Sequence, residues 1–403
     1  MAPTCAHGSA ETPMKVAVPT ETFPGEQRVA LIPGDISTLG KAKLEILVQK
    51  GAGEAAGFSD QDYADKGATI VENRGELLSQ ADIVVQVRSL GANKAEGQQD
   101  LEYFKPDQVV IGLSDPLGEP ESAKKLAEKG VMAFSMEMIP RISRAQSMDA
   151  LSSMATIAGY KAVLLGASES RKIFPMLMTA AGMVKPSRVF IIGAGVAGLQ
   201  AIATAKRLGS VVEAYDVRPA VKEQCESLGA KFVELDLETD DGAEDKGGYA
   251  TELGEDFYRK QREVMTRVVS NSDVVVTTAA IPGKKSPVLI TTDMVDKMAP
   301  GSVIVDLAAE RGGNCELTKA DERVDYNGIV ILGPTNLPAT IPNHASQMYS
   351  RNITTLLKSL VKEGELNIDM EDEVTAGTLV SRSGNVVHER IKGLLEPQAE
   401  SEE

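Results

Sequence analysis

The sequence is poor in the residues that most often act as catalytic bases or bind metals. Its 403 residues include three cysteines, three histidines and no tryptophan. The cysteines, Cys5, Cys225 and Cys315, are odd in number, lie far apart and form no CxxC pair. This pattern indicates a reducing compartment rather than a disulfide framework, and we expect no metal site.

Positive charge and long apolar runs are also scarce. Acidic residues outnumber basic ones by 58 to 42, and the formal net charge is −16, which disfavours nucleic acid and anionic lipid headgroups as partners. The longest stretch without a charge, 189–205, contains three glycines and is too short for a membrane span. Residues 1–13 lack the apolar core of a signal peptide. We expect no membrane span in this chain, and disorder at 1–13 and 396–403.

The composition and the periodicity indicate a globular α/β protein. Apolar residues make up 42% of the chain, enough for a proper core, and the length suits two domains. Strand and helix patterns alternate at spacings typical of βα units. We expect two Rossmann-like domains with parallel sheets, joined by two long helices around a cleft. The first domain comprises 14–145 plus 345–395, and the second spans 150–342.

The expected elements follow from apolar runs and turn residues. Strands are predicted at 15–18, 44–48, 68–71, 83–87, 108–113 and 131–134, and in the second domain at 188–192, 211–215, 231–235, 273–278, 303–306 and 329–332. The two long helices are expected near 150–171 and 344–361, and a hairpin near 378–388.

The clearest motif lies between the strand at 188–192 and a helix of small residues. Glycines occupy the three positions of GxGxxG, at Gly193, Gly195 and Gly198. In a dinucleotide-binding fold the first makes a tight turn, the second lets the backbone approach a pyrophosphate, and the third lets the helix lie close to the strand. The helix N-terminus then offers free N–H groups to the anion.

An acidic residue at the end of the next strand strengthens this interpretation. Asp216 follows the strand at 211–215, where a carboxylate can hold a ribose 2′-OH and would repel the 2′-phosphate of NADP. We therefore expect NAD(H) binding. Arg218, two residues further on, leaves NADP open, and a glycine-rich structural turn is the alternative to any nucleotide site.

Two loops are unusual. Residues 136–149 crowd two arginines, a glutamine and an aspartate beside a long helix, which is more than a plain linker with a helix-capping Asp149 would need. Residues 237–254 are acidic, glycine-rich and poor in apolar residues, so they form either a lid or a solvated insertion. In the lid interpretation Tyr249, beside two glycines, closes over a bound cofactor.

The scarcity of histidine bears on the chemistry. Oxidation of an alcohol or amine needs a general base near the reacting carbon, most often His or Lys. His7, His344 and His388 all lie outside the loops of the first domain. Hydride exchange between two nicotinamide rings moves no proton to or from the reacting atoms, so it needs close apposition of the rings rather than an acid or base. The polar loop fits that demand better, although a lysine or a water relay could replace histidine.

These residues carry a family likeness. The chain resembles the NAD(H)-binding component, domain I, of proton-translocating nicotinamide nucleotide transhydrogenase, which is itself similar to alanine dehydrogenase. The resemblance covers about residues 14–393. Its most specific pieces are Pro-Arg-Ile-Ser-Arg-Ala-Gln-Ser-Met-Asp at 140–149, the glycine motif and helix at 193–209, Gly-Gly-Tyr at 247–249, Ala-Ile-Pro-Gly-Lys at 280–284, and the strand and turn at 300–308.

The resemblance implies a set of site residues. Those at the nicotinamide end, including the proposed catalytic groups, are Arg141, Ile142, Ser143, Gln146, Asp149 and Ser152. Ser152 would bind the carboxamide, and Gln146 would reach toward the NADP(H) of the partner. Those along the rest of the coenzyme are Gly193, Gly195, Val196, Ala197 and Gly198 at the pyrophosphate, Asp216, Val217 and Arg218 at the adenosine ribose, and Gly248, Tyr249 and Ala280.

The resemblance also implies partners that this chain lacks. NADP(H) would bind a separate domain III, and a membrane subunit would carry protons. The activity implied is that of a proton-translocating, Re/Si-specific NAD(P)+ transhydrogenase, with this chain as a cytoplasmic homodimer, peripheral on the inner membrane through its partner.

Two alternatives remain. An alanine dehydrogenase would need an arginine, a lysine, a histidine and an aspartate in its substrate pocket. Here Arg28 stands for the arginine, Arg88 replaces the lysine, residues 110–114 lack the histidine, and Glu310 stands for the aspartate. An arginine stays protonated and cannot act as the base that a lysine could. A non-catalytic NAD-sensing module is the second alternative.

Overall fold

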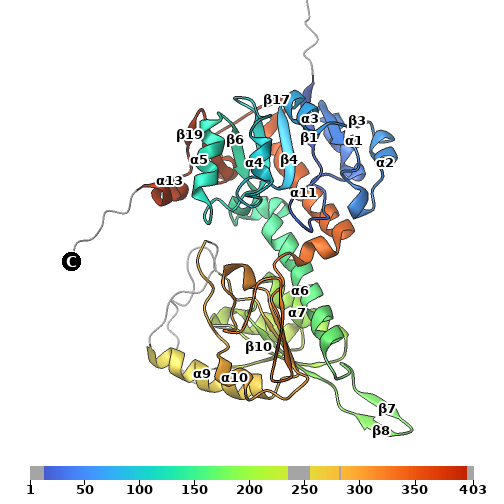
Figure 1. Cartoon of the computed structure of the whole chain (residues 1–403), viewed down its shortest axis with the longest axis vertical. Coiled ribbons are helices and arrows are strands. Elements are labelled where there is room, and N and C mark those ends of the chain that lie inside the picture. The colour runs from blue at the N-terminus through green and yellow to red at the C-terminus, as the bar shows by residue number, and fades with distance from the viewer. Residues whose placement is uncertain (1–12, 235–254, 281–282, 397–403) are drawn as a thin grey trace, which may run out of the picture. The chain divides into compact units, whose positions relative to one another are not determined.

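The computed structural model describes residues 13–234, 255–280 and 283–396 (Figure 1). The chain divides into two compact units, and each is described by itself. Unit 1 comprises Met1–Ala150 with Pro342–Glu403, and unit 2 comprises Leu151–Ile341. Both are α/β units with mainly parallel sheets, the fold class that the sequence predicts.

Unit 1 is built on an eight-stranded sheet in the order β19-β18-β6-β5-β4-β1-β2-β3. Strands β1 to β6 are parallel, and the hairpin β18–β19 joins antiparallel to β6. The strands are β1 (Met14–Val18), β2 (Leu44–Gln49), β3 (Thr69–Val71), β4 (Ile83–Arg88), β5 (Val109–Leu113), β6 (Met132–Ser135), β18 (Leu379–Arg382) and β19 (Asn385–Val386), with β16 (Val361–Lys362) and β17 (Glu365–Leu366) in a separate ribbon.

The helices of unit 1 begin and end where the local sequence favours it. Pro33 occupies the first turn of α1, and Ser59 forms a capping box with Asp62 at the start of α2. The helices are α1 (Pro33–Lys41), α2 (Asp60–Ala64), α3 (Arg74–Gln80), α4 (Gly97–Asp100), α5 (Pro120–Glu128), α11 (Pro342–Leu360), α12 (Glu373–Thr378) and α13 (Glu389–Leu395), with short 3₁₀ turns η1 (Glu54–Ala56), η2 (Met136–Met138) and η3 (Ser143–Met148).

The late hairpin confirms its prediction. Ser383 and Gly384 connect β18 to β19 with φ of 49° and 80°. Positive φ at both central residues is the condition for the two-residue turn whose twist matches the flanking strands. The hairpin thereby returns the C-terminal part of the chain to the sheet that the N-terminal part begins.

Unit 2 is built on a seven-stranded sheet in the order β11-β10-β9-β12-β13-β15-β14, parallel except for β14. The strands are β9 (Arg188–Ile192), β10 (Val211–Tyr215), β11 (Lys231–Phe232), β12 (Val274–Thr277), β13 (Val303–Asp306), β14 (Arg323–Tyr326) and β15 (Ile329–Leu332), with a separate ribbon of β7 (Leu177–Thr179) and β8 (Gly182–Val184). The helices are α6 (Ala150–Glu169), α7 (Val196–Arg207), α8 (Lys222–Ser227), α9 (Glu255–Ser270) and α10 (Thr292–Val295), with η4 (Pro219–Val221), η5 (Ala309–Arg311) and η6 (Leu337–Thr340).

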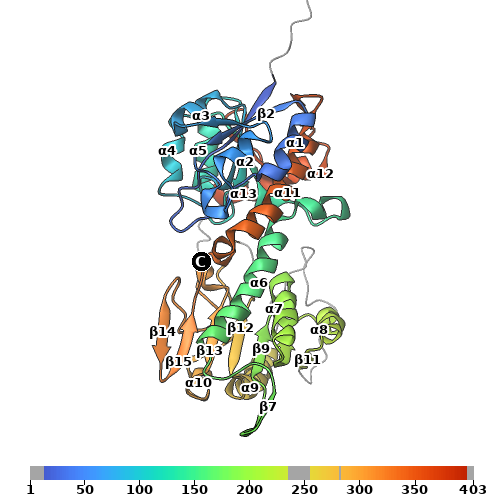
Figure 2. The ribbon, with the colours of Figure 1, turned by 90° about the vertical axis from the view of Figure 1, so that its right-hand side faces the viewer.

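Alternate side chains of the central strands of unit 2 enter two separate cores. Val189 and Ile191 pack with α6, α7 and α8 on one face, and Phe190 and Ile192 pack with α9 and α10 on the other. Figure 2 shows α6 and α7 together on one side of β9, β12 and β13. Burial on both faces explains why these strands are apolar without interruption.

Helix α6 is the apolar helix of this core. Within the described residues it is the one helix that is long and apolar enough to cross a membrane, judged by length and composition alone. Ala162 and Val163 are fully buried in the core of unit 2, as in a core helix. Gly159 brings the helix against the first turn of α7, since a Cβ there would lie 2.0 Å from the carbonyl oxygen of Ala197.

The structure also differs from the prediction in places. β11 ends at Phe232 rather than at residue 235, and the strands β7, β8 and β14 were not anticipated. β14 is a half-exposed edge strand with alternating polar residues, and β7 and β8 are exposed throughout, so neither carries the apolar run that marks the central strands. The predicted lid at 237–254 lies outside the described residues.

We predict that Gly159→Ala destabilises the protein by about 2 kcal/mol or more, because the added methyl group cannot fit against the Ala197 carbonyl. Alanine has the better helix propensity by roughly 1 kcal/mol, so the sign of the effect is informative. The matched control is Gly40→Ala in α1, where a Cβ would meet nothing within 4 Å. Denaturant unfolding compares the two, and equal responses would contradict the close packing.

Candidate functional site

The glycine motif lies at the point in the unit 2 sheet where the strand order reverses, between β9 and β12. Ligands of open α/β sheets bind at such a point, beyond the carboxyl ends of the strands. Gly193 adopts φ of +92°, which a residue with a side chain rarely adopts. A Cβ at Gly198 would lie 1.8 Å from the carbonyl oxygen of Gly193, so this turn depends on glycine at both positions.

The N-terminus of α7 faces the loop without a side-chain cap. Gly195 is its N-cap residue and makes no capping hydrogen bond through a side chain. Gly195 and Val196 are exposed, Ala197 is half-buried and Gly198 is buried. The first N–H groups of a helix lack intrahelical acceptors and carry the positive end of its dipole. This end of α7 can therefore accept a pyrophosphate.

Asp216 connects the end of β10 to the glycine loop. Its Oδ2 accepts a hydrogen bond from the Ala194 N–H at 2.7 Å. Both of its oxygens also bind Arg218, whose Nε and Nη2 each lie 2.9 Å from an oxygen of the carboxylate. Val217 between them is half-buried. The structure thus brings the predicted acid and arginine together beside the loop.

The segment after β12 is held by two residues that the sequence analysis missed. Asn314 accepts from the Ala279 N–H at 3.0 Å and donates to the Ala279 carbonyl at 2.8 Å, which fixes the backbone before Ala280. Asp306 is fully buried, and its Oδ2 accepts from the N–H of Asn314 at 2.7 Å. A carboxylate that accepts several hydrogen bonds is a strong organiser of loops. Its position at the end of an apolar strand, like that of Asp216, was the signal for it.

The polar loop of unit 1 exposes some residues and anchors others. Arg141, Ser143 and Gln146 are exposed, and Ile142 and Asp149 are half-buried. Ala145 and Met148 are buried in the unit. The loop therefore holds a fixed conformation while it presents polar side chains.

Two contacts with the C-terminal part of unit 1 fix this loop. Arg144 pairs with Asp372 at 2.7 Å, and Asp372 also caps α12 through the N–H groups of Val374 and Thr375. The Asn352 side chain on α11 donates to the Ser147 carbonyl at 2.9 Å. Sequence reasoning had not separated Arg144 from the site residues. The structure shows that it is part of the support.

The remaining predicted residues fall elsewhere. Ser152 lies in the first turn of α6, in unit 2, where its carbonyl accepts a hydrogen bond from Thr156. Ala280 is described and exposed, whereas Gly248 and Tyr249 lie outside the described residues. Among the described residues, no cluster of His, Cys, Asp and Glu could hold a metal ion.

The sheet of unit 1 has its own reversal point, between β1 and β4, and a buried charge cluster lies there. Glu21 accepts from the N–H groups of Val87 and Arg88 at 2.6 and 3.0 Å. Glu26 binds the guanidinium of Arg28, which is 3% exposed, and also contacts Arg88. Burial raises the pKa of Glu21 to about 7, and the nearby Glu26 carboxylate adds to the rise.

This cluster contains two of the four positions compared with alanine dehydrogenase. Arg28 is tied to Glu26, and Arg88 lies 4.2 Å over the ring of Phe23. Glu310 is an exposed residue of η5 in unit 2. A cationic guanidinium cannot take a proton from a substrate, so the two arginines of the cluster supply no general base.

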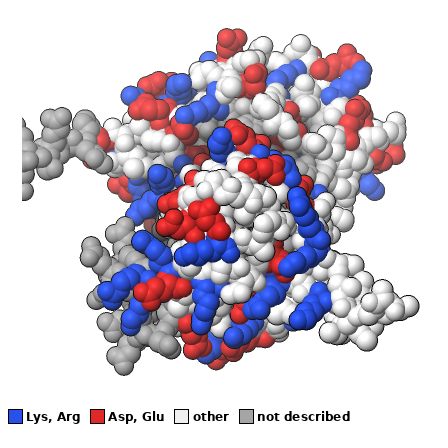
Figure 3. Space-filling view, turned by 60° about the horizontal axis from the view of Figure 1, so that its bottom comes forward, with Lys and Arg blue, Asp and Glu red and all other residues white. Residues whose placement is uncertain are grey.

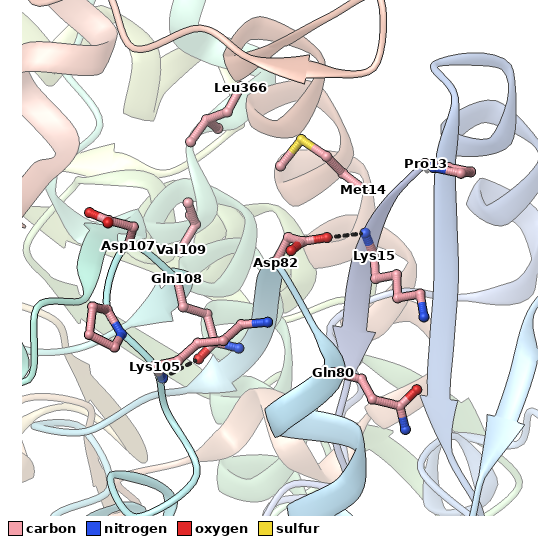
Figure 4. A pocket seen from close by; sticks show the side chains of 11 residues that line it. Pro13, Met14, Lys15, Gln80, Asp82, Lys105, Asp107, Gln108, Val109 and Leu366 are labelled. Carbon is pink, nitrogen blue, oxygen red and sulfur yellow. Dashed lines mark hydrogen bonds between the residues drawn. The ribbon is translucent and has the colours of Figure 1, made fainter. Parts of the chain in front are cut away.

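A pocket of about 540 Å³ lies at the opposite edge of the unit 1 sheet (Figure 4). It is formed where β1, β4 and β5 begin, and it contains none of the predicted site residues. Asp82 accepts from the Lys15 N–H, and Gln108 donates to the carbonyls of Leu78 and Ala81. These polar groups serve the fold, and the amino ends of parallel strands are not where such sheets bind ligands.

Comparison with known proteins gives family models that match nearly the whole chain. Residues 17–158 match the model described as alanine dehydrogenase/PNT, N-terminal domain, and residues 162–389 match alanine dehydrogenase/PNT, C-terminal domain.

Relatives and solved structures agree with these models. The chain is 46% identical to an NAD(P) transhydrogenase subunit alpha polypeptide from Rhodospirillum rubrum, over 94% of this chain and 99% of that protein. It is 26% identical to alanine dehydrogenase from Bacillus subtilis, over 94% of each. The crystal structure of transhydrogenase from Sinorhizobium meliloti matches with a TM-score of 0.80 and 38% identity, over 93% of this chain and 99% of that one.

We predict that the Glu21 carboxyl makes the stability of the protein depend on pH. Because its folded pKa is about 7 and its ordinary value 4.5, the folded state favours the protonated form. Its contribution is fully present below about pH 4.5 and is lost as the pH rises through about 7. The free energy of unfolding of the native protein should therefore fall between pH 5 and 8, relative to Glu21→Gln, by on the order of 1–3 kcal/mol.

Denaturant unfolding of both proteins across this pH range measures the difference. Glu137, whose pKa burial also raises, is present in both proteins, so the comparison isolates Glu21. Parallel stability curves would show that Glu21 is ionised normally in the folded protein.

Proposed function

The chain belongs to the alanine dehydrogenase/PNT family, and from that premise we propose that it is the NAD(H)-binding subunit of a proton-translocating, Re/Si-specific NAD(P)+ transhydrogenase. The observation that carries the proposal is the 46% identity to a transhydrogenase alpha subunit across nearly the full length of both chains, against 26% for an alanine dehydrogenase. The family relationship makes the chain an oxidoreductase of the transhydrogenase family.

NAD(H) is proposed to bind along the carboxyl edge of the unit 2 sheet. The uncapped N-terminus of α7 suits the pyrophosphate, with Gly193, Gly195 and the backbone of Val196, Ala197 and Gly198. Asp216, Val217 and Arg218 take the adenosine ribose, and Ala280 lines the site. This assignment is supported by the exposed helix end and by the acid beside it.

The nicotinamide end is assigned to the loop of unit 1 and the start of α6. Arg141, Ile142, Ser143, Gln146 and Asp149 take that role by family likeness, together with Ser152 and the undescribed Gly248 and Tyr249. When bound, the coenzyme supplies the hydride. The residues of the chain orient the ring and exclude water, and none of them has to accept a proton. The fixed backbone and the exposed Gln146 support this division of roles.

The second coenzyme, NADP(H), is assigned to a separate domain III, and proton movement to a membrane subunit. By this proposal the chain is cytoplasmic and peripheral on the inner membrane through its partners. Gln146 is proposed to lie at the surface where the two nicotinamide rings meet, and its exposure suits that role.

We also propose that two copies of the chain associate as a homodimer. The ribbon β7–β8 pairs with no other described strand, and its residues are exposed, Met178 at 74% and Met183 at 58%. In Figure 3 it is a projection without charged side chains. A lone two-stranded hairpin is marginal in water, and an exposed apolar projection commonly marks an interface.

The amino-acid dehydrogenase alternative is disfavoured by the cluster in unit 1, where an arginine occupies the position of the lysine. An NAD-sensing module would bind the coenzyme but transfer no hydride with any partner. The same experiment separates all three.

We predict that hydride transfer appears only when an NADP(H)-loaded domain III is added. The chain is mixed with that domain, and reduction of an NAD analogue by NADPH is followed by absorbance. Turnover of alanine, or of pyruvate with ammonia, by the chain alone would favour the dehydrogenase instead. Gln146→Asn should slow transfer about tenfold or more while the Kd for NADH changes little, because misplacement by about 1 Å is costly at the reacting atoms. The reverse pattern would reject its role between the rings.

We predict that replacing the apolar residues of the hairpin weakens the dimer. Met178→Gln with Met183→Gln removes apolar surface from the projection, and sedimentation velocity should show a shift toward monomer at micromolar concentration. Met370→Gln, at an exposed methionine of unit 1, is the control and should leave the dimer intact. A native protein that is monomeric at all concentrations would refute the proposal.

A further inference from the structure

The pairing of Asp216 with Arg218 is closer than nucleotide binding requires. The Asp216 carboxylate receives four hydrogen bonds, from the N–H of Ala194 and from the N–H, Nε and Nη2 of Arg218, at 2.7 to 2.9 Å. The side chains are 6% and 17% exposed respectively. The carboxylate therefore covers the edge of the guanidinium through which arginine binds anions in pairs.

The pair stands where coenzymes are told apart. In dinucleotide-binding folds an acid at the end of the second strand holds the 2′-OH of NAD, and an arginine nearby accommodates the 2′-phosphate of NADP. This chain carries both, two residues apart. The positive charge of Arg218 partly cancels that of Asp216, so repulsion between Asp216 and a 2′-phosphate is a weaker basis for selection than the sequence suggested.

We propose that Asp216 selects NAD(H) mainly by occupying Arg218. Its carboxylate fills the anion position of a latent 2′-phosphate site, and a 2′-phosphate can bind there only by displacing it. This inference rests on the coenzyme site proposed in unit 2. It assigns Arg218 as a specificity-determining residue that is silent in the native chain, in an enzyme whose other coenzyme is NADP(H).

The test is the affinity for the two coenzymes. Asp216→Asn retains an oxygen that can accept from the Ala194 N–H but removes the charge that holds Arg218. We expect NADPH to bind Asp216→Asn about tenfold more tightly than it binds the native protein, the size of one or more charge-assisted hydrogen bonds, and NADH to bind several-fold more weakly. Calorimetric titration of the full chain with each coenzyme, and with adenosine 2′,5′-bisphosphate against 5′-AMP, gives the Kd values.

The gain must depend on Arg218. Adding Arg218→Met to Asp216→Asn should abolish the increased affinity for NADPH and for the bisphosphate. Adding Arg188→Met instead removes an arginine that is also paired, to Glu213 at 3.2 Å, at the other end of the strands, and should leave the gain intact. Asp216→Ala checks that the effect does not depend on the new amide.

The outcomes separate this inference from the coenzyme site itself. If Asp216→Asn weakens NADH without any gain for NADPH, or if the gain survives Arg218→Met, Asp216 does not occupy a latent phosphate site. If neither coenzyme responds to any Asp216 substitution, the coenzyme does not bind beside β10, and the proposed site in unit 2 fails with it.

Discussion

The close approach of backbone to backbone at the glycine loop of unit 2 is the constraint on which the candidate site depends. Gly198 lies against the Gly193 carbonyl, and Gly159 of α6 lies against the carbonyl of Ala197 in the same turn of α7. No side chain intervenes at either contact, so the first turn of α7 is fixed from two directions. Its unsatisfied N–H groups are thereby positioned before any anion arrives, which lowers the entropic cost of binding.

Carboxylates at the ends of strands organise the rest of this edge. Asp216 after β10 binds the N–H of Ala194, and Asp306 at the end of β13 binds the backbone of Asn314, which in turn holds Ala279. In unit 1, Glu21 similarly binds backbone N–H groups at the end of β4. Each joins two loops that are far apart in the sequence. Loops that bind a flat coenzyme need such support because they contain no regular secondary structure of their own.

The chemistry that this edge can perform follows from what it contains. The described loops offer backbone N–H groups, hydroxyls, amides and guanidinium groups, and the cations of unit 1 are already paired with buried carboxylates. Such groups orient and bind but do not exchange protons near neutral pH. A reaction that passes a hydride between two rings asks for no more than this, whereas an amino-acid dehydrogenase asks for a base. The family relationship and the residues present therefore favour the same reaction.

The sequence by itself determined the parts that depend on local pattern. Apolar runs marked the central strands of both sheets, GxGxxG marked the loop after β9, and Ser383-Gly384 marked the late hairpin. It did not reveal β7, β8 and β14, whose exposed residues carry no strong periodicity. Nor did it reveal the roles of Asp306, Asn314 and Arg144. Only the tertiary structure decided those, and it also decided that Asp216 binds Arg218, because such partners are chosen by distance in space, which the order of residues along a chain does not record.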